Sequence, residues 1–258
     1  MNTPISYEFP LNERMRVFIR LEQLFHQFYH HLHGTASADK RAAISLLLDI
    51  VAIFKRNDLK SEILKELDRQ ANVLNKIAVN QNQGVDTQKL QELLTQLNGI
   101  SQKLYAMTGK IGNHIMESDL FQSVAQRSAI PGGTCSFDLP EFHYWLNQDD
   151  ATCVHDLSQW SRPFADIGEA IALILSFIRN SHTVTEEIAP AGFFQITLDT
   201  NLPNQLVCVS LDKSQPYFVE ISGGKHRCTI RFMYPSRDSQ RPTQSSENIP
   251  FTLTCCIF

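Results

Sequence analysis

The hydrophobic pattern changes its period near Gly192, and this change constrains the fold more than any other feature of the chain. Before Gly192, apolar residues recur every three or four positions, as they do on one face of an α-helix. After it, apolar and polar residues alternate, as they do in a strand with one buried face. Helices followed by strands indicate an α+β protein, with an N-terminal helical bundle and an antiparallel β-strand domain.

Long amphipathic helices are expected throughout the first part of the chain. Asn12 is a suitable N-cap for the first of them. Ser118 is expected to cap a shorter helix that ends at Arg127, and Asp138 and Glu141 have the spacing of a capping box for another. The long helices are predicted over about 13–32, 38–56, 59–79, 87–107 and 164–180.

The second part of the chain is predicted to be built from strands, which follow a loop at about 181–190. The polar run 235–248 is expected to be a flexible excursion between the last two strands. The strands are predicted at Phe193–Leu198, Leu206–Leu211, Tyr217–Ile221, Arg227–Met233 and Phe251–Cys256.

The first residues also alternate: Ile5 to Phe9 read as a short strand that ends at Pro10. This strand has no neighbour in sequence with which to pair, so we expect it to join the C-terminal strands. The predicted domains are therefore an α-helical domain at 10–185 and a β-strand domain at 186–258, to which residues 5–9 contribute a strand.

The composition argues against several classes of protein. The net charge is −4, whereas a nucleic-acid-binding protein usually carries a strong basic excess. No apolar run approaches the roughly 18 residues of a membrane span, and the first 14 residues lack the pattern of an export signal. The six cysteines show no zinc-binding spacing, which favours a reduced cytosolic protein without metal or cofactor.

Two motifs that invite a chemical interpretation are better explained structurally. His26 and His30 lie one helical turn apart, but two imidazoles without a third ligand are more typical of a solvated helix end than of a metal site. The run from Pro131 to Cys135 (Pro-Gly-Gly-Thr-Cys) lacks the features of a nucleophile loop and predicts a tight turn. We therefore expect no enzymatic activity.

The most suggestive basic residues are Arg227 and Arg231, which fall on one face of a predicted strand with Thr229 between them. Their Cα atoms should lie about 13 Å apart, at about 3.3 Å per residue. Two forked cations on one exposed face are suited to an anion or an acidic peptide. The alternative is that they are solubilising charges on the outer face of the sheet.

Three further arginines have sufficient local explanations. Arg16 and Arg20 are four positions apart on the first helix, where they fit a charged outer face, and Arg56 ends the second helix, where a cation suits the helix dipole. If the first strand pairs with the C-terminal strands, however, the start of the first helix is brought close to the β domain. We therefore hypothesise that these arginines line one groove with Arg227 and Arg231.

Several segments together resemble the ZapD family of bacterial cell division factors. They occur in the family's order and at similar spacing, and they extend from the first strand to the last. The matching segments are Tyr7 to Arg16, Leu64 to Gln70, Ile130 to Gly133 with Cys135 to Pro140, and Ile221 to Arg227 with Ile230 to Met233.

The resemblance implies a cytoplasmic homodimer at the midcell division site. Such proteins bind the C-terminal tail of FtsZ, a tubulin-like GTPase, and bundle its filaments during Z-ring assembly; they are not enzymes. The tail is bound in a basic pocket between the two domains, without nucleic acid or membrane insertion. The matching residues are Arg16, Arg20, Arg56, Arg227 and Arg231, to which the same segments add Lys225 and His143.

Two alternatives from other classes remain open. One is a nucleic-acid-binding regulator that uses the same arginines, although no stacking aromatic residue separates them in sequence. The other is a hydrolase centred on Cys135, for which no general base is evident. The chain departs from the family at 235–248 and at 79–88, so the resemblance assigns no function to those regions.

Overall fold

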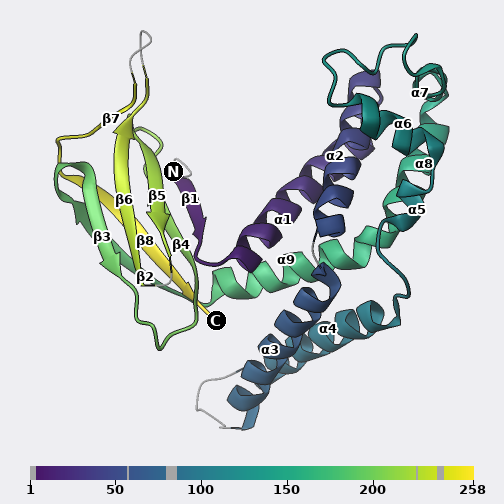
Figure 1. Cartoon of the computed structure of the whole chain (residues 1–258). Helices are drawn as coiled ribbons and strands as arrows, with labels where there is room; N and C mark the ends of the chain where they lie inside the picture. The colour runs from purple at the N-terminus through teal and green to yellow at the C-terminus, as the bar shows by residue number, and fades with distance from the viewer. Residues whose placement is uncertain (1–3, 57, 80–85, 225, 237–240) are drawn as a thin grey trace. The chain divides into compact units, whose positions relative to one another are not determined.

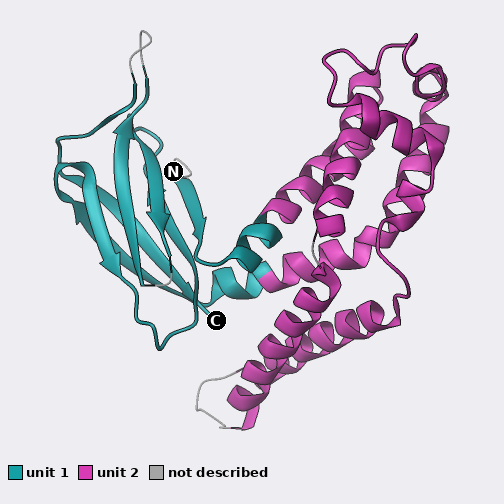
Figure 2. Cartoon of the chain, in the orientation of Figure 1, with its two compact units in different colours: residues 1–19, 175–258 teal, residues 20–174 magenta. Residues whose placement is uncertain are grey.

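The computed structural model describes residues 4–56, 58–79, 86–224, 226–236 and 241–258 (Figure 1). The chain divides into two compact units, which are coloured separately in Figure 2. The helical unit covers residues 20–174, and the β unit covers residues 1–19 and 175–258.

The helices agree closely with those predicted for the long amphipathic segments. Asn12 caps the first of them, because its side-chain oxygen accepts a hydrogen bond from the Met15 backbone N–H at 3.0 Å. The helices are α1 (Glu13–Leu32), α2 (Ser37–Arg56), α3 (Leu59–Val79), α4 (Thr87–Ala106), α5 (Asn113–Met116), α6 (Asp119–Arg127), α7 (Pro140–Leu146), α8 (Asp150–Ser161) and α9 (Ala165–Asn180), with short 3-10 turns η1 (Arg162–Phe164) and η2 (Pro190–Gly192).

The helical unit is held together by apolar stripes and by a group of aromatic side chains. Trp160 packs edge-on against Phe121, with ring centroids 4.8 Å apart, and lies 5.4 Å from Trp145. The Trp145 indole N–H is satisfied by the Asp156 carboxylate at 3.0 Å, so the ring is buried without an unpaired donor. This group joins α6, α7 and α8 into one core.

The β unit consists of two antiparallel sheets. The first has the strand order β1-β4-β8-β2; the second has the order β3-β6-β5, and the short strand β7 also pairs with β6. The strands are β1 (Ile5–Pro10), β2 (His182–Ala189), β3 (Phe193–Thr197), β4 (Asn204–Leu211), β5 (Phe218–Gly223), β6 (Arg227–Tyr234), β7 (Thr243–Gln244) and β8 (Ile249–Ile257). The predicted α+β class is therefore confirmed.

The first strand pairs with a C-terminal strand, as predicted. β1 runs antiparallel to β4, with Ile5 opposite Leu211 and Phe9 opposite Val207. The Leu11 backbone N–H continues the contact by donating to the Gln205 carbonyl at 2.9 Å. The start of α1 therefore belongs to the β unit.

The two sheets bury their apolar faces against each other. Val209 and Leu253 come from the first sheet and Ile230 and Phe232 from the second, and all four are nearly inaccessible to solvent. The rings of Phe232 and Phe251 meet across the core, with centroids 5.0 Å apart. Inward residues alternate with outward ones along each strand, and on β6 the outward positions are those of Arg227, Thr229 and Arg231.

Three local predictions were wrong. Residues 181–190 are not a loop, since His182–Ala189 forms β2 along the edge of the first sheet. Asp138 does not cap α7, whose N-cap is Leu139; the Asp138 carboxylate instead pairs with Arg127 at 3.1 Å. The run 235–248 is not only an excursion, because it contains β7 and the buried Ser245; residues 237–240 within it lie outside the described residues.

Within the described ranges, no helix combines the length and the apolar character that crossing a bilayer requires.

Candidate functional site

The outer face of the second sheet displays the two arginines that the sequence singled out. Along β6, Cys228, Ile230 and Phe232 are buried, whereas Arg227 and Arg231 are exposed. This alternation was predicted, and it places both guanidinium groups on the solvent side of the sheet. We call this surface, defined by the outward residues of β3, β5 and β6, the open sheet face.

The strand register gives Arg231 an aromatic and an acidic neighbour. Phe193 of β3 lies opposite Arg231 on one side, and Glu220 of β5 lies opposite it on the other. Side chains in such positions have Cβ atoms about 5 Å apart. Phe193 is 39% exposed, so its ring is accessible from solvent.

Neither arginine of the open sheet face forms an ion pair with a carboxylate of the described residues, and this includes Glu220. Next to Arg231 along β6, Met233 and its partner Phe218 are half-buried on the same face. The surface thus combines cations with an apolar border, which suits a peptide that carries both acidic and apolar side chains.

The other predicted residues of the β unit are less free or lie outside the described residues. The Arg16 guanidinium donates to the Glu13 carboxylate at 2.7 Å, within the first turn of α1. This pair is solvent-exposed, with 38% of the Arg16 side chain accessible, so a partner's carboxylate can compete with Glu13 for it. Lys225 lies outside the described residues.

Three predicted residues belong to the helical unit. Arg20 is exposed on α1, and His143 is exposed on α7. Arg56 is the last residue of α2 and lines a pocket. The hypothesis of one groove therefore draws on residues of both units, and it stays a prediction.

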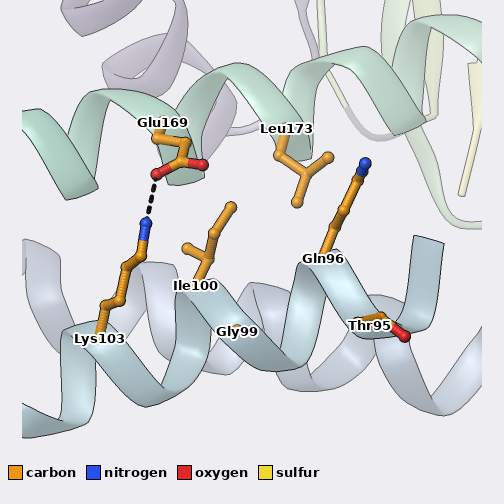
Figure 3. A pocket seen from close by; sticks show the side chains of 7 residues that line it. All are labelled: Thr95, Gln96, Gly99, Ile100, Lys103, Glu169 and Leu173. Atoms are coloured by element: carbon orange, nitrogen blue, oxygen red, sulfur yellow. Dashed lines mark hydrogen bonds and ion pairs between the residues drawn. The ribbon is translucent and has the colours of Figure 1, made fainter. Parts of the chain in front are cut away.

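A second hollow in the helical unit offers less charge to a ligand. It is a groove of about 470 Å³ between α4 and α9, shown in Figure 3. Its one cation, Lys103, is already bound to Glu169 at 3.0 Å and to Asp166 at 3.5 Å. These carboxylates raise the pKa of Lys103, mainly through the hydrogen bond that its ammonium donates to Glu169.

The motifs weighed for catalytic or metal chemistry lie in turns and on helix α1, where His26 and His30 are exposed. The run from Pro131 to Cys135 lies in turns between α6 and α7, where Gly132 adopts a positive φ of 73°. His31 bonds to Asp39 at 2.9 Å, and this hydrogen bond lowers the pKa of the Asp39 carboxyl. Among the residues with described positions, no three His, Cys, Asp or Glu side chains gather as a metal site.

The sequence did not indicate two features of these surfaces. Phe193 was expected only as part of a strand, because its position beside Arg231 depends on the β3–β6 register. Lys55, Lys60 and Lys110 were not singled out, although they line the same pocket as Arg56. No local pattern could have found Lys110, since it reaches the pocket from the segment that follows α4.

Comparison with known proteins gives one consistent result. The family model described as "ZapD: Cell division protein" matches residues 19–231. The chain is 48% identical over 257 residues to "Cell division protein ZapD" of Methylococcus capsulatus, and all of both chains is covered. It is 36% identical to the proteins of the same name from Aromatoleum aromaticum, where 98% of this chain and 97% of the relative are covered, and Nitrosomonas eutropha, where the shares are 98% and 99%.

Proposed function

The chain belongs to the ZapD family of cell division proteins, and from this we propose that it binds the C-terminal tail of FtsZ. In this proposal it acts in the cytoplasm at the midcell division site, as a homodimer that cross-links FtsZ filaments and promotes Z-ring assembly. It does so without catalysis. The observation that supports the proposal best is the open sheet face, where Arg227 and Arg231 are exposed and form no ion pair with a described carboxylate.

The energies suit a reversible contact with a filament. A charge-assisted hydrogen bond contributes roughly 1.5–3 kcal/mol when partly desolvated, and an exposed ion pair about 0–1 kcal/mol. Three or four such contacts with one apolar anchor would reach about −8 kcal/mol, which corresponds to roughly micromolar affinity. Phe193 beside Arg231 is suited to be that anchor.

The remaining predicted residues would extend this binding surface. We propose that Arg16, Arg20, Arg56, Lys225 and His143 contribute further contacts to the same tail. A dimer with two tail sites can hold two filaments, and the second contact then gains from a high effective concentration. Modest affinity at each site is sufficient because every subunit of a filament carries a tail.

Co-sedimentation with FtsZ filaments tests this function. The full chain should pellet with intact FtsZ, and it should stay in the supernatant when FtsZ lacks its C-terminal tail. Binding should weaken as salt rises, because exposed charges are screened over about 8–10 Å. Equal pelleting with tail-less filaments would contradict the proposal, and a gel shift at physiological salt would support the nucleic-acid alternative.

A further inference from the structure

Besides the open sheet face of the β unit, the protein has a second basic surface, which is a pocket in the helical unit. Its volume is about 440 Å³, and it is lined by the end of α2, the start of α3 and the segment between α4 and α5. This volume falls in the lower part of the range of about 300–1,000 Å³ that is typical of small-molecule sites. We call it the α2–α3 pocket.

The α2–α3 pocket has a large excess of positive charge. Its lining contains four cations, Lys55, Arg56, Lys60 and Lys110, and one acidic residue, Asp58. No ion pair joins any of the four cations to a carboxylate of the described residues. A protein of net charge −4 thus concentrates uncompensated cations in one hollow.

The single carboxylate of the pocket already accepts two hydrogen bonds at the start of α3. Asp58 precedes α3, and its oxygens accept hydrogen bonds from the Ser61 backbone N–H at 3.4 Å and from the Ser61 hydroxyl at 2.6 Å. These bonds lower the pKa of Asp58. The Lys60 ammonium donates to the Met107 carbonyl at 2.6 Å, which anchors it at the pocket without neutralising it.

Two further features of the lining favour an anion with an organic part. The 21-residue helix α3 begins at the pocket, and the positive end of its dipole adds to the cationic side chains. Phe54 and Ile111 are half-buried and supply an apolar wall, and the Phe54 ring packs against Phe164 with centroids 5.4 Å apart. The pocket therefore has a cationic part and an apolar part.

We propose that the α2–α3 pocket binds the diphosphate or triphosphate group of a small molecule, either as the free inorganic ion or esterified to a nucleoside. Several negative charges in a small volume match four clustered cations better than a single carboxylate does, because a monoanion would leave most of the cations uncompensated. The pocket is lined by residues of the helical unit, whereas the open sheet face belongs to the β unit, and the pocket shares only Arg56 with the residues proposed for tail binding.

Isothermal titration of the full chain with inorganic pyrophosphate, with inorganic triphosphate and with ATP tests the proposal. Wild-type protein should bind at least one of them saturably. The double variant Lys55→Gln/Lys110→Gln should lose on the order of tenfold or more in affinity, because two charge-assisted contacts are removed. The matched double variant Lys76→Gln/Lys89→Gln changes two exposed lysines elsewhere in the helical unit and should stay within about twofold of wild type.

Inorganic triphosphate, which has the same number of phosphates as ATP, distinguishes the source of the phosphate. Tighter binding of ATP than of inorganic triphosphate would assign a nucleotide, and equal or tighter binding of the inorganic ion would assign the free ion. The variant Arg227→Glu/Arg231→Glu should bind the best of the probes as wild type does, so failure of this proposal is separable from failure of tail binding. Absence of saturable binding by all of the probes, or equal loss in the pocket and control variants, would overturn the proposal.

Discussion

Arg179 and Glu8 form a two-pronged ion pair that joins the end of α9 to the first strand. The Arg179 Nε donates to Glu8 Oε1 at 2.7 Å, and its Nη2 donates to Oε2 at 2.8 Å. Both side chains are about one-third exposed or less, at 32% and 27%. Together with the ladder between β1 and β4, this pair fixes the start of α1, and with it Arg16, within the β unit.

The Arg179–Glu8 pair should contribute measurably to stability. A double-mutant cycle with Glu8→Gln and Arg179→Gln is expected to give a coupling energy of about 1–2 kcal/mol, because the paired geometry is partly shielded from water. Urea unfolding measures it. The exposed single contact between Arg127 and Asp138 is the control, with an expected coupling of about 0–1 kcal/mol. A coupling for Arg179–Glu8 no larger than the control would count against this role.

Phe193→Ala should weaken tail binding without unfolding the β unit. We expect a loss of about 1–2 kcal/mol, or roughly 5- to 30-fold in affinity, because the apolar anchor beside Arg231 is removed. Fluorescence anisotropy with a labelled FtsZ tail peptide measures the change. Phe137→Ala, at an 83% exposed phenylalanine of the helical unit, is the matched control and should bind as wild type does.

The cysteines should differ sharply in their reactivity towards alkylating reagents. Burial raises the pKa of the Cys228 thiol to about 11, so at pH 8 only about one molecule in a thousand carries the thiolate. Cys135 is exposed. Mass spectrometry after brief treatment with iodoacetamide should find Cys135 modified first and Cys228 modified only after unfolding. Comparable native rates at the two positions would show that the core of the β unit is open.

Lys40 should make stability decline at alkaline pH. Its buried ammonium lies 2.8 Å from the Asp150 carboxylate, and this hydrogen bond is the main cause that raises the pKa of Lys40 above its ordinary value of 10.5. Because the pKa of Lys40 is higher in the folded protein than in the unfolded chain, the charged ammonium stabilises the fold fully at any pH below the pKa of the unfolded chain. That stability is lost as the pH rises through the pKa of the folded protein, which lies above 10.5.

Lys40→Met is therefore expected to lower the free energy of unfolding by about 1–2 kcal/mol at neutral pH. The difference from wild type should shrink above pH 10.5. Urea unfolding over a pH series measures it. Lys65→Met, which breaks the exposed pair with Glu62, is the control and should cost about 0–1 kcal/mol at neutral pH. A Lys40→Met difference that grows with pH would contradict the assigned sign.

The sequence predicted those elements whose buried face is strongly apolar. Helix α1 follows from Asn12 and its apolar stripe, and the alternation from Arg227 to Phe232 correctly placed the arginines outside. β2 was missed because the side chains it turns towards the sandwich include Thr183, Thr185 and Glu187, so no apolar alternation marks it.

Helix α8 was missed for a related reason. The buried stripe of this helix consists of Cys153, Leu157 and Ser161, and it is narrow and partly polar. The open sheet face and the α2–α3 pocket were missed for a different reason. The neighbours of Arg231 and Arg56 depend on strand register and on loop placement. Such relations are set by tertiary packing, and local periodicity carries no information about them.

Charge reversal on the open sheet face tests the central claim most directly. The variant Arg227→Glu/Arg231→Glu should lose at least about tenfold in co-sedimentation with FtsZ filaments while its melting temperature is unchanged, because two contacts become repulsive. Lys89→Glu/Lys213→Glu makes the same change in net charge at exposed positions that are not part of that face and should sediment as wild type does. Undiminished co-sedimentation after reversal of both arginines would contradict the account.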